Sequence, residues 1–289
     1  MKAYLYLQYL VRYKRRPSFS TPQRFSEKMY CLKLINEKLY KTLLQRCYDK
    51  FDVRGYVVEK LGEDEGNSIL NRVYGVYEDA AEIDFDALPE KIVLKVTQSS
   101  GSNIICRNKK DLDIAHATSQ LNKWLNEAKK ASTKSEEGYM YTGRAKILCE
   151  EYLENSSGEI PPDIRVYCFN GAPKLFVCDF GTTDERGEHG EHIVRNVYDL
   201  NWNLIDVNLG RPHDEDVVME RPDNLERIVE IAKKLAEDFL FVRVDLYDVD
   251  GRLIFGELTW IPMGGNCVIE PDRYDYLMGS WLSIPELSV

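Results

Sequence analysis

The sequence lacks any apolar run near the ~20 residues that a membrane-spanning helix needs. A secretory leader pattern is missing too: the apolar residues of segment 1–10 come first, the basic residues follow, and no small-residue cleavage site comes after them. Internal repeats and low-complexity runs are also absent from the 289 residues, of which 44% are hydrophobic. We therefore expect no transmembrane segment, and one large core or two to three docked subdomains.

Paired cysteine motifs are also missing. The seven cysteines are an odd number, are widely spaced and contain no C-x-x-C pair (Cys31, Cys47, Cys106, Cys149, Cys168, Cys178, Cys267). His189 and His192, the closest histidines, have no cysteine near them, so a zinc site is not expected. The pattern predicts reduced, mostly buried thiols and a cytoplasmic protein.

The chain has no surplus of positive charge, because its net charge is −10. A nucleic-acid partner is therefore not expected. The phosphate-binding sequences G-x-x-x-x-G-K-[ST] and G-x-G-x-x-G are absent as well. A nucleotide site of another kind stays open, since a few lysines and a metal ion make such a site locally whatever the overall charge.

Acidic residues are absent before Glu27, whereas Arg12, Lys14, Arg15 and Arg16 follow the apolar start. We interpret this segment as an ordinary amphipathic first helix. The alternative is a basic stretch that makes weak contact with an anionic membrane surface.

The hydrophobic pattern predicts an α+β protein with antiparallel sheets. Residues 1–60 are rich in Leu, Tyr and Lys and predict mostly helix, with breaks near Pro17 and Pro22. Two more helices are expected near 111–131 and after Pro222, and residues 180–196 predict a mobile polar loop. Strands are expected over residues 92–97, 104–106, 145–153, 163–169, 173–179, 241–247 and 252–260.

The most informative segment is the strand pair within residues 241–260. Since side chains alternate between strand faces, Arg243 and Asp245 lie opposite the apolar face of the first strand, as do Glu257 and Thr259 in the second. A three-residue loop over 249–251 would set Arg243 opposite Glu257, with Asp245 diagonally near it. A two-residue turn would send the acids into the core, a costly desolvation, so the longer loop is predicted.

Two carboxylates on adjacent strands, with a hydroxyl beside them, are what Mg²⁺ accepts as protein ligands. The same pattern also fits a solvated face with a cross-strand pair of arginine and glutamate. The hairpin alone leaves both interpretations open.

Two other segments have features of a nucleotide site. Lys95 lies in the middle of an apolar strand, and the loop 99–102 that follows offers backbone N–H groups and hydroxyls to phosphates. Glu150 and Glu151 end another strand, where carboxylates and backbone groups would read an adenine edge and ribose hydroxyls. Each segment alone is more often an ordinary turn or a strand end with solvated acids.

In order along the chain, these segments resemble the TupA-like branch of the ATP-grasp enzymes, named for teichuronopeptide biosynthesis. The resemblance covers roughly residues 17 to 281 and is carried by four motifs: D-K-F-D-V-R-G-Y-V at 49–57, L-P with V-L-K at 88–95, Y-C-F-N-G-A-P-K at 167–174, and the hairpin 242–259. It implies two α+β subdomains that grip ATP, preceded by a helical region. The expected regions are the helical region 1–90, a small lid subdomain 91–150 and a catalytic subdomain 151–289.

The resemblance also implies roles for individual residues with ATP and Mg²⁺. Lys50 and Lys95 would contact phosphate, and the flexible loop would consist of Ser100, Gly101 and Ser102. Glu150, Glu151 and Leu153 would line the adenine pocket, and Asp163 would meet the ribose. Asp245 and Glu257 would hold Mg²⁺ beside Thr259, and Arg243 would be the catalytic arginine that steadies the transferring phosphate.

Two positions depart from the family's pattern. The usual Glu-x-Asn is Glu257-Leu258-Thr259 here, which leaves the number of Mg²⁺ ions open because a hydroxyl is a poorer ligand than an amide oxygen. The loop has one glycine, Gly101, where many relatives have several.

The resemblance implies an ATP-dependent carboxylate–amine ligase that forms an amide through an acyl phosphate. The carboxylate would belong to a cell-surface polysaccharide or its uronic-acid precursor, and the amine to an amino acid or peptide. An anionic acceptor would meet Arg165, Arg195, His189 and His192. The alternatives are an ATP-grasp kinase that acts on a sugar or polyol hydroxyl, and a non-catalytic ATP-binding module.

Overall fold

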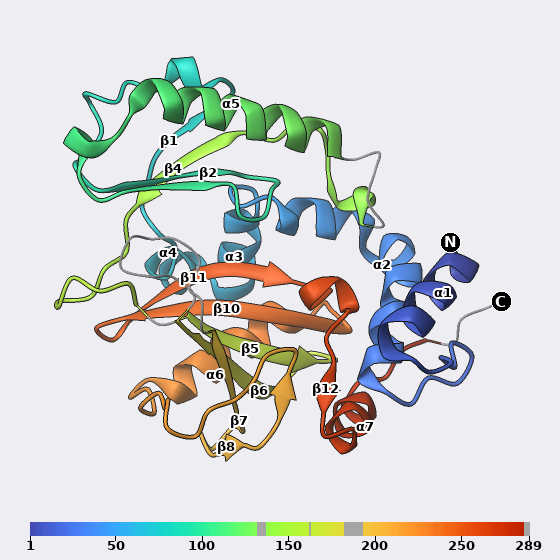
Figure 1. Ribbon diagram of the computed structural model, residues 1–289. Helices are drawn as coiled ribbons and strands as arrows, with labels where there is room; N and C mark the ends of the chain where they lie inside the picture. Colours follow the sequence, from blue (N-terminus) through green and yellow to red (C-terminus); the bar gives the residue numbers. More distant parts are fainter. Residues whose placement is uncertain (132–136, 162, 182–192, 286–289) are drawn as a thin grey trace. The chain divides into compact units, whose positions relative to one another are not determined.

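The computed structural model describes residues 1–131, 137–161, 163–181 and 193–285 (Figure 1). The chain divides into two compact units: unit 1 is Met1–Leu39 with Pro162–Val289, and unit 2 is Tyr40–Pro161. Helices accompany strands in both units, and the paired strands are antiparallel throughout the described residues. The predicted α+β class with antiparallel sheets and a helical N-terminal region is confirmed.

The helices are α1 (Lys2–Tyr13), α2 (Phe25–Tyr48), α3 (Val53–Leu61), α4 (Glu63–Ser68), α5 (Ile114–Ala131), α6 (Leu225–Ala236) and α7 (Arg273–Trp281). The strands are β1 (Val73–Tyr77), β2 (Ile92–Val96), β3 (Asn103–Cys106), β4 (Ile147–Glu151), β5 (Asp163–Phe169), β6 (Ala172–Phe180), β7 (Val194–Tyr198), β8 (Leu204–Ile205), β9 (Asn208–Leu209), β10 (Phe241–Val249), β11 (Arg252–Thr259) and β12 (Ile269–Glu270). None of the helices in the described ranges combines the length and the apolar character needed to cross a membrane.

Unit 2 is built on a four-stranded sheet with the order β1-β4-β2-β3. The inward side chains of β2 are fully buried at Ile92, Leu94 and Val96, and they share one core with Leu121 and Leu125 of α5. That alternation on β2 follows from the two-residue period of a strand with one buried face. Val93 and Lys95 point outward, and the side chain of Lys95 is left for polar contacts.

Unit 1 is built on a six-stranded sheet with the order β11-β10-β5-β6-β7-β8. Helix α6 packs on β10, β5 and β6 through its buried apolar residues (Leu225, Ile228, Ile231, Ala232, Leu235, Ala236). Val229 of the same helix is half-buried. Because α6 covers one face of the sheet, the polar side chains of β5, β6, β10 and β11 gather on the other face.

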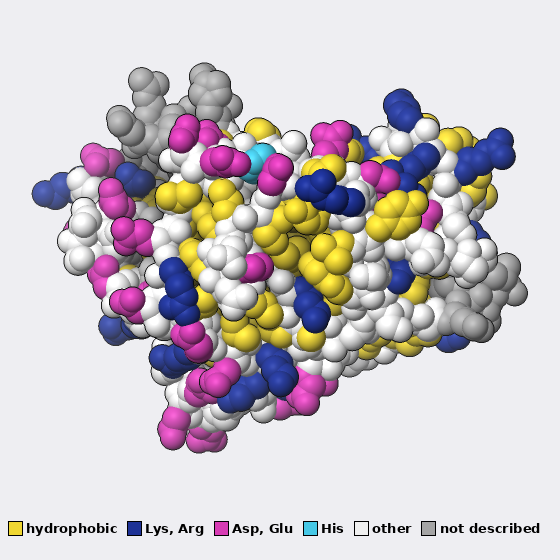
Figure 2. All heavy atoms as spheres, turned by 90° about the horizontal axis from the view of Figure 1, so that it is seen from below, with side chains coloured by type: hydrophobic (Ala, Val, Ile, Leu, Met, Phe, Trp, Pro, Cys, Tyr) yellow, Lys and Arg dark blue, Asp and Glu magenta, His cyan; other side chains and the backbone are white. Residues whose placement is uncertain are grey.

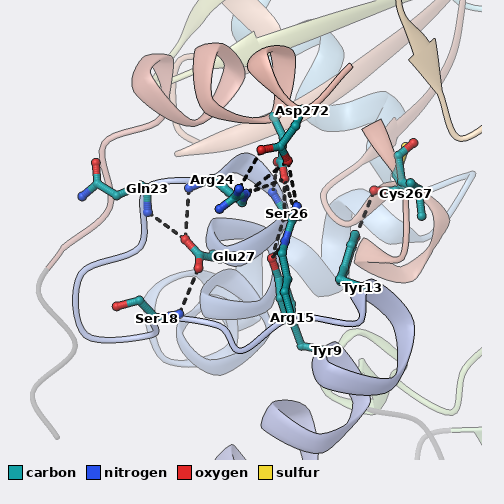
Figure 3. A network of polar contacts seen from close by, with 12 residues as sticks. Tyr9, Tyr13, Arg15, Ser18, Gln23, Arg24, Ser26, Glu27, Cys267 and Asp272 are labelled. Carbon is teal, nitrogen blue, oxygen red and sulfur yellow. Dashed lines mark hydrogen bonds and ion pairs between the residues drawn. The ribbon is translucent and has the colours of Figure 1, made fainter. Parts of the chain in front are cut away.

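The N-terminal residues belong to unit 1 through a network of polar contacts (Figure 3). The buried carboxylate of Asp275 accepts hydrogen bonds from the Ser26 backbone N–H at 2.8 Å and its hydroxyl at 2.7 Å. Arg15 donates to Asp275 at 2.6 Å and to Asp272 at 2.7 Å. Glu27 accepts from the backbone N–H groups of Ser18 and Gln23, both at 2.9 Å, and so closes the turn before α2.

The observed units differ from the three consecutive regions 1–90, 91–150 and 151–289. Strand β1 lies inside the region expected to be helical, and it joins unit 2 because it pairs with β4. The segment 1–39 joins the C-terminal part because of the Asp275 network. Ile284 also packs against an apolar cluster of that segment (Leu5, Tyr9, Phe19, Tyr30, Cys31). Of the predicted loop 180–196, residues 194–196 belong to β7 and residues 182–192 lie outside the described residues.

All seven cysteines are free and buried, as the sequence predicts. The surface carries charges of both signs: Figure 2 shows one face on which acidic and basic side chains are interspersed around hydrophobic ones. That face therefore has no large patch of charge of a single sign among its described residues.

Candidate active site

The hairpin of β10 and β11 is closed by a two-residue turn, so the predicted three-residue loop is wrong. Val249 pairs with Arg252, and the turn residues Asp250 and Gly251 have φ values of 50° and 85°. A tight hairpin turn of this kind needs positive φ at both positions, which an Asp-Gly pair supplies.

A β-bulge at Gly256 then restores the arrangement that the turn alone would destroy. Leu246 pairs with Phe255 but Asp245 pairs with Glu257, so β11 contains one extra residue between the two pairs. A side chain on Gly256 would lie only 3.1 Å from the Asp245 carbonyl oxygen. The two acids therefore share a face as predicted, directly opposite each other and not on a diagonal.

Arg243 holds both carboxylates. Its Nε donates to Asp245 Oδ1 at 2.7 Å, and its Nη2 donates to Glu257 Oε1 at 2.7 Å and to the second oxygen of Asp245. In the ladder Arg243 pairs with Thr259, whereas the predicted register paired it with Glu257. The Thr259 hydroxyl donates to Glu257 Oε1 at 3.1 Å. Asp245 is buried, whereas half of the Glu257 side chain is exposed.

The electrostatics of this cluster favour a bound cation. Burial, together with the charges of Asp163 and Glu257, raises the pKa of Asp245 to about 8, although the charge of Arg243 opposes this shift. Burial lowers the pKa of Arg243, but the charge of Asp245 and its hydrogen bond, with the charges of Tyr167 and Glu257, together raise that pKa overall. The carboxylates thus repel one another in a poorly solvated place, and a cation that joined them would relieve the repulsion.

The same sheet face continues across β5. Arg165 stands opposite Asp245 in the ladder, and its Nε donates to Asp163 Oδ2 at 2.8 Å. The other oxygen of Asp163, Oδ1, is buried and has no hydrogen-bond partner in the described ranges. A buried oxygen without a partner is costly, so this atom is suited to a donor that a ligand brings.

Asp179 on β6 is the centre of the next cluster. Arg195 Nη2 donates to its Oδ2 at 2.7 Å, Arg211 Nη1 donates to the same oxygen at 2.8 Å, and Arg165 donates to it as well. Burial alone would raise the pKa of Asp179, but the hydrogen bond from Arg195 and the charges of Arg165 and Arg195 hold it at about 2. The arginines Arg165 and Arg195, expected to meet an anionic acceptor, are thus brought together.

Asp179 and Arg211 were missed by the sequence reasoning. Asp179 could have been found, because it is a carboxylate on the polar side of a strand and pairs with Arg195 on β7. Arg211 gave no signal in the sequence, because it lies in a loop after β9. That loop is held in place by the hydrogen bond that the Arg195 backbone N–H donates to the Pro212 carbonyl at 2.9 Å.

In unit 2, Lys95 and Glu150 form an ion pair. Lys95 Nζ donates to Glu150 Oε2 at 2.8 Å from the neighbouring strand, and Arg54 Nη1 lies 3.9 Å from the other oxygen of Glu150. Glu150 is buried, whereas one third of the Lys95 side chain is exposed. Two residues predicted for different parts of the nucleotide are therefore neighbours.

The D-K-F-D motif is fixed to the end of β2 by Asp49. Its Oδ1 accepts from the backbone N–H groups of Phe51 at 2.9 Å and Asp52 at 3.1 Å. Its Oδ2 accepts from the Thr97 hydroxyl at 2.7 Å. Asp49 was not among the predicted site residues, although it is the first residue of the motif. The neighbouring Lys50 donates from Nζ to the Ser99 carbonyl and so lies at the predicted loop.

The remaining predicted nucleotide residues are placed as follows. In the loop, the Ser99 and Ser102 hydroxyls are hydrogen-bonded at 2.6 Å, Ser100 is exposed, and Gly101 has a φ of 71°. Glu151 and Leu153 are half-buried, and the Glu151 carbonyl accepts from Asn71 Nδ2 at 2.9 Å.

His189 and His192 lie outside the described residues. Within the parts that are described, no three or more His, Cys, Asp or Glu side chains form a group that would hold a metal ion. A Mg²⁺ ion at Asp245 and Glu257 would therefore complete its shell with water and phosphate oxygens, which is how it is usually bound.

The sequence matches the family described as TupA-like ATPgrasp over residues 23–283. The match covers most of the chain, so the chain belongs to the TupA-like ATP-grasp family, and the resemblance seen in its motifs is confirmed. Its fold is the ATP-grasp fold. No curated protein matches the sequence.

Similar solved structures are distant in sequence. D-alanine–D-alanine ligase from Bacillus anthracis is 14% identical with a TM-score of 0.47, and the match covers 77% of this chain and 60% of the ligase. The ligase of the same name from Helicobacter pylori is 10% identical with a TM-score of 0.47, covering 92% of this chain and 68% of the other. The ATP-grasp ligase PsnB, in complex with a precursor variant, Mg and ADP, is 13% identical with a TM-score of 0.45, covering 88% and 65%. The chain thus spans 60% of the length of the Bacillus anthracis ligase.

Proposed function

We propose that this protein is an ATP-dependent carboxylate–amine ligase. The observation that carries the proposal is the bulged hairpin, on which Asp245 and Glu257 stand directly opposite each other and share one arginine, Arg243. Membership of an ATP-grasp family supplies the chemical context. An ordinary solvated face would not bury Asp245 beside the half-buried Asp163 and Arg165.

The cofactors we propose are ATP and Mg²⁺. Asp245 and Glu257 would hold the ion with Thr259 beside them, because hard carboxylate and hydroxyl oxygens suit it. When bound, Mg²⁺ supplies neutralising charge for the phosphates. A cation at these two carboxylates competes with Arg243 for the same oxygens.

The remaining contacts of the nucleotide would be shared among the predicted residues. Lys50, Lys95 and the loop of Ser100, Gly101 and Ser102 would contact phosphate, and Glu150, Glu151 and Leu153 would line the adenine pocket. Asp163 would accept a hydrogen bond from a ribose hydroxyl, which its unpartnered Oδ1 supports.

The proposed reaction has two steps, phosphorylation of the carboxylate and displacement of phosphate by the amine. A substrate carboxylate oxygen forms a bond to the γ-phosphorus of ATP, ADP leaves, and an acyl phosphate results. An amine nitrogen then forms a bond to the acyl carbon, inorganic phosphate leaves, and the amine proton is lost to water or a nearby carboxylate. The protein acts mainly by position and charge, and Arg243 would stabilise the oxygens of the transferring phosphoryl group.

The substrates we propose are a carboxylate on a cell-surface polysaccharide or its uronic-acid precursor and the amine of an amino acid or peptide. The family to which the chain belongs supports this choice, as do Arg165, Arg195 and Arg211 on the polar face of unit 1. We place the reaction in the cytoplasm, because free, buried thiols suit a reducing compartment.

A panel of uronic acids combined with amino acids tests this function, with release of ADP and phosphate and product mass as readouts. A ligase releases phosphate only when both substrates are present, and the product mass is their sum less one water. ADP without free phosphate, together with a phosphorylated sugar, would establish the kinase instead. Nucleotide binding without turnover on any pair would leave only the ATP-binding module.

A further inference from the structure

Helix α1 is apolar on two opposite faces. Leu5 and Tyr9 are fully buried and pack on Phe19, Tyr30 and Cys31. The opposite face of a surface helix is normally polar. Here Tyr4, Leu7 and Val11 follow one another at intervals of three and four residues, and so lie on one line.

These three side chains are well exposed. Their exposed fractions are 56% for Tyr4, 61% for Leu7 and 69% for Val11, and Met1 at the start of the helix is 71% exposed. Exposed large apolar residues are common singly, but a line of them on one short helix marks an interaction surface.

An apolar groove borders this line. It has a volume of about 690 Å³ and is lined mainly by Ala3, Tyr6, Leu7, Pro17 and Phe19. Leu7 belongs to both features, so the exposed line and the groove form one continuous apolar surface.

The charged side chains of α1 and of the turn that follows it are of one sign. Lys2, Lys14 and Arg16 are exposed on α1 and the turn that follows it, and no acidic residue occurs before Glu27. This segment is basic in a chain whose net charge is −10.

We propose that α1 docks on the surface of an anionic lipid bilayer. A helix with an apolar line and flanking lysines and arginines lies in the plane of the headgroups, where apolar burial and attraction to anionic lipid add together. A second copy of the chain fits less well, because pairing two such helices brings basic residues of both copies together. The surface is separate from the residues proposed for ATP, so the inference goes beyond the proposed ligase activity.

Co-sedimentation with vesicles tests the proposal. Neutral phosphatidylcholine vesicles are compared with vesicles that contain about one third phosphatidylglycerol, at low and high salt. We expect binding to the anionic vesicles only, reduced at high salt, and reduced at least tenfold by the double variant Leu7→Glu/Val11→Glu. Val218→Glu is the matched control, because Val218 has the same exposed fraction as Leu7, 61%. Arg16→Glu is expected to weaken binding, and Lys110→Glu, another exposed basic residue, is not.

Thermal melting by circular dichroism checks that the variants fold, and the single variant Val11→Glu replaces the double one if it does not. Equal binding to neutral vesicles, or wild-type binding by the folded α1 variants, would overturn the proposal. Sedimentation velocity gives the third outcome that overturns it: a dimer that Leu7→Glu/Val11→Glu dissolves would show that a second copy covers this face. None of these readouts depends on ATP turnover.

Discussion

Charged residues on the polar face of the unit 1 sheet form one connected network. Arg243 joins Asp245 to Glu257, and Arg165 joins Asp163 to Asp179. The two groups are linked because Arg165 Nε lies 3.7 Å from Asp245 Oδ2, and Asp179 also holds Arg195 and Arg211. A buried charge is tolerated only when it is paired and hydrogen-bonded, and each member of this network has a partner of opposite sign. The network therefore makes a polar surface possible on a sheet that is otherwise a core element.

Asp179→Asn is expected to lower the free energy of unfolding by at least about 2 kcal/mol at neutral pH, because it leaves three arginines without their shared carboxylate. The pKa of Asp179 is held at about 2, below that of an unfolded aspartate. Its stabilisation is therefore complete above about pH 4 and is lost as the pH falls toward 2.

Urea unfolding of the wild type and Asp179→Asn across this pH range measures the effect, with Glu230→Gln on the exposed side of α6 as an isosteric control. The difference between wild type and Asp179→Asn should shrink as the solution is acidified. A difference that stays constant down to pH 2 would contradict the assigned pKa.

Lys95→Ala is expected to weaken ATP binding about tenfold or more while the fold stays intact, because a charged contact to phosphate is lost. Lys91→Ala is the matched control: Lys91 also lies in unit 2 and also forms an ion pair, with Glu154 at 2.5 Å. Calorimetric titration with Mg-ATP measures both. If the two variants bind equally well, or if Lys95→Ala fails to fold, the lysine is structural and its assignment to phosphate is wrong.

At the scale of elements, the sequence predicts the faces of the β10–β11 hairpin correctly and its register wrongly. The alternation of Val242, Val244 and Leu246 identifies the buried face, because the side-chain period of a strand is fixed. The bulge at Gly256 is invisible to the same reasoning, since an extra residue depends on how two backbones approach each other. The cost of desolvation correctly predicts that the two acids share a face, although the predicted turn and the diagonal placement are wrong.

Gly256→Ala tests the bulge. Its new methyl group would lie 3.1 Å from both the Asp245 carbonyl oxygen and Tyr247 Cε2, too close for the ladder to stay unchanged. We expect a loss of about 1–3 kcal/mol in the free energy of unfolding, measured in urea, as for other overpacked sites. We also expect weaker Mg²⁺-dependent binding of ATP, because the pairing of Asp245 with Glu257 depends on the bulge. Wild-type stability together with wild-type binding would show that the bulge does not set this pairing.

At the scale of the whole molecule, the order of the segments along the chain does not predict which segments form each compact unit. Helices and longer strands could be predicted because their patterns are local, and so could most candidate residues, which lie on them. Short strands such as β8, β9 and β12 have too few residues for a period to appear. Strand β1 and the segment 1–39 are assigned by distant partners, β4 and Asp275, which no local pattern contains.

Contacts between segments that are distant in the sequence also explain which part of the candidate site was missed. Asp245, Glu257 and Arg243 lie on one hairpin, so their proximity follows from local sequence. Arg211 reaches Asp179 from 32 residues away, and this contact depends on the fold of the whole unit.

The measurement that tests the central claim most directly is the shift of melting temperature by ATP with and without Mg²⁺, in the wild type, Asp245→Asn and Glu257→Gln. A ligand that binds only the folded state raises the melting temperature, so Mg-ATP should stabilise the wild type by several degrees. ATP without Mg²⁺ should stabilise it less. In the two variants the additional effect of Mg²⁺ should disappear although both fold, whereas the isosteric control Glu230→Gln should behave as the wild type. A full Mg²⁺-dependent shift in either variant would contradict the account, because it would show that these carboxylates do not hold the ion.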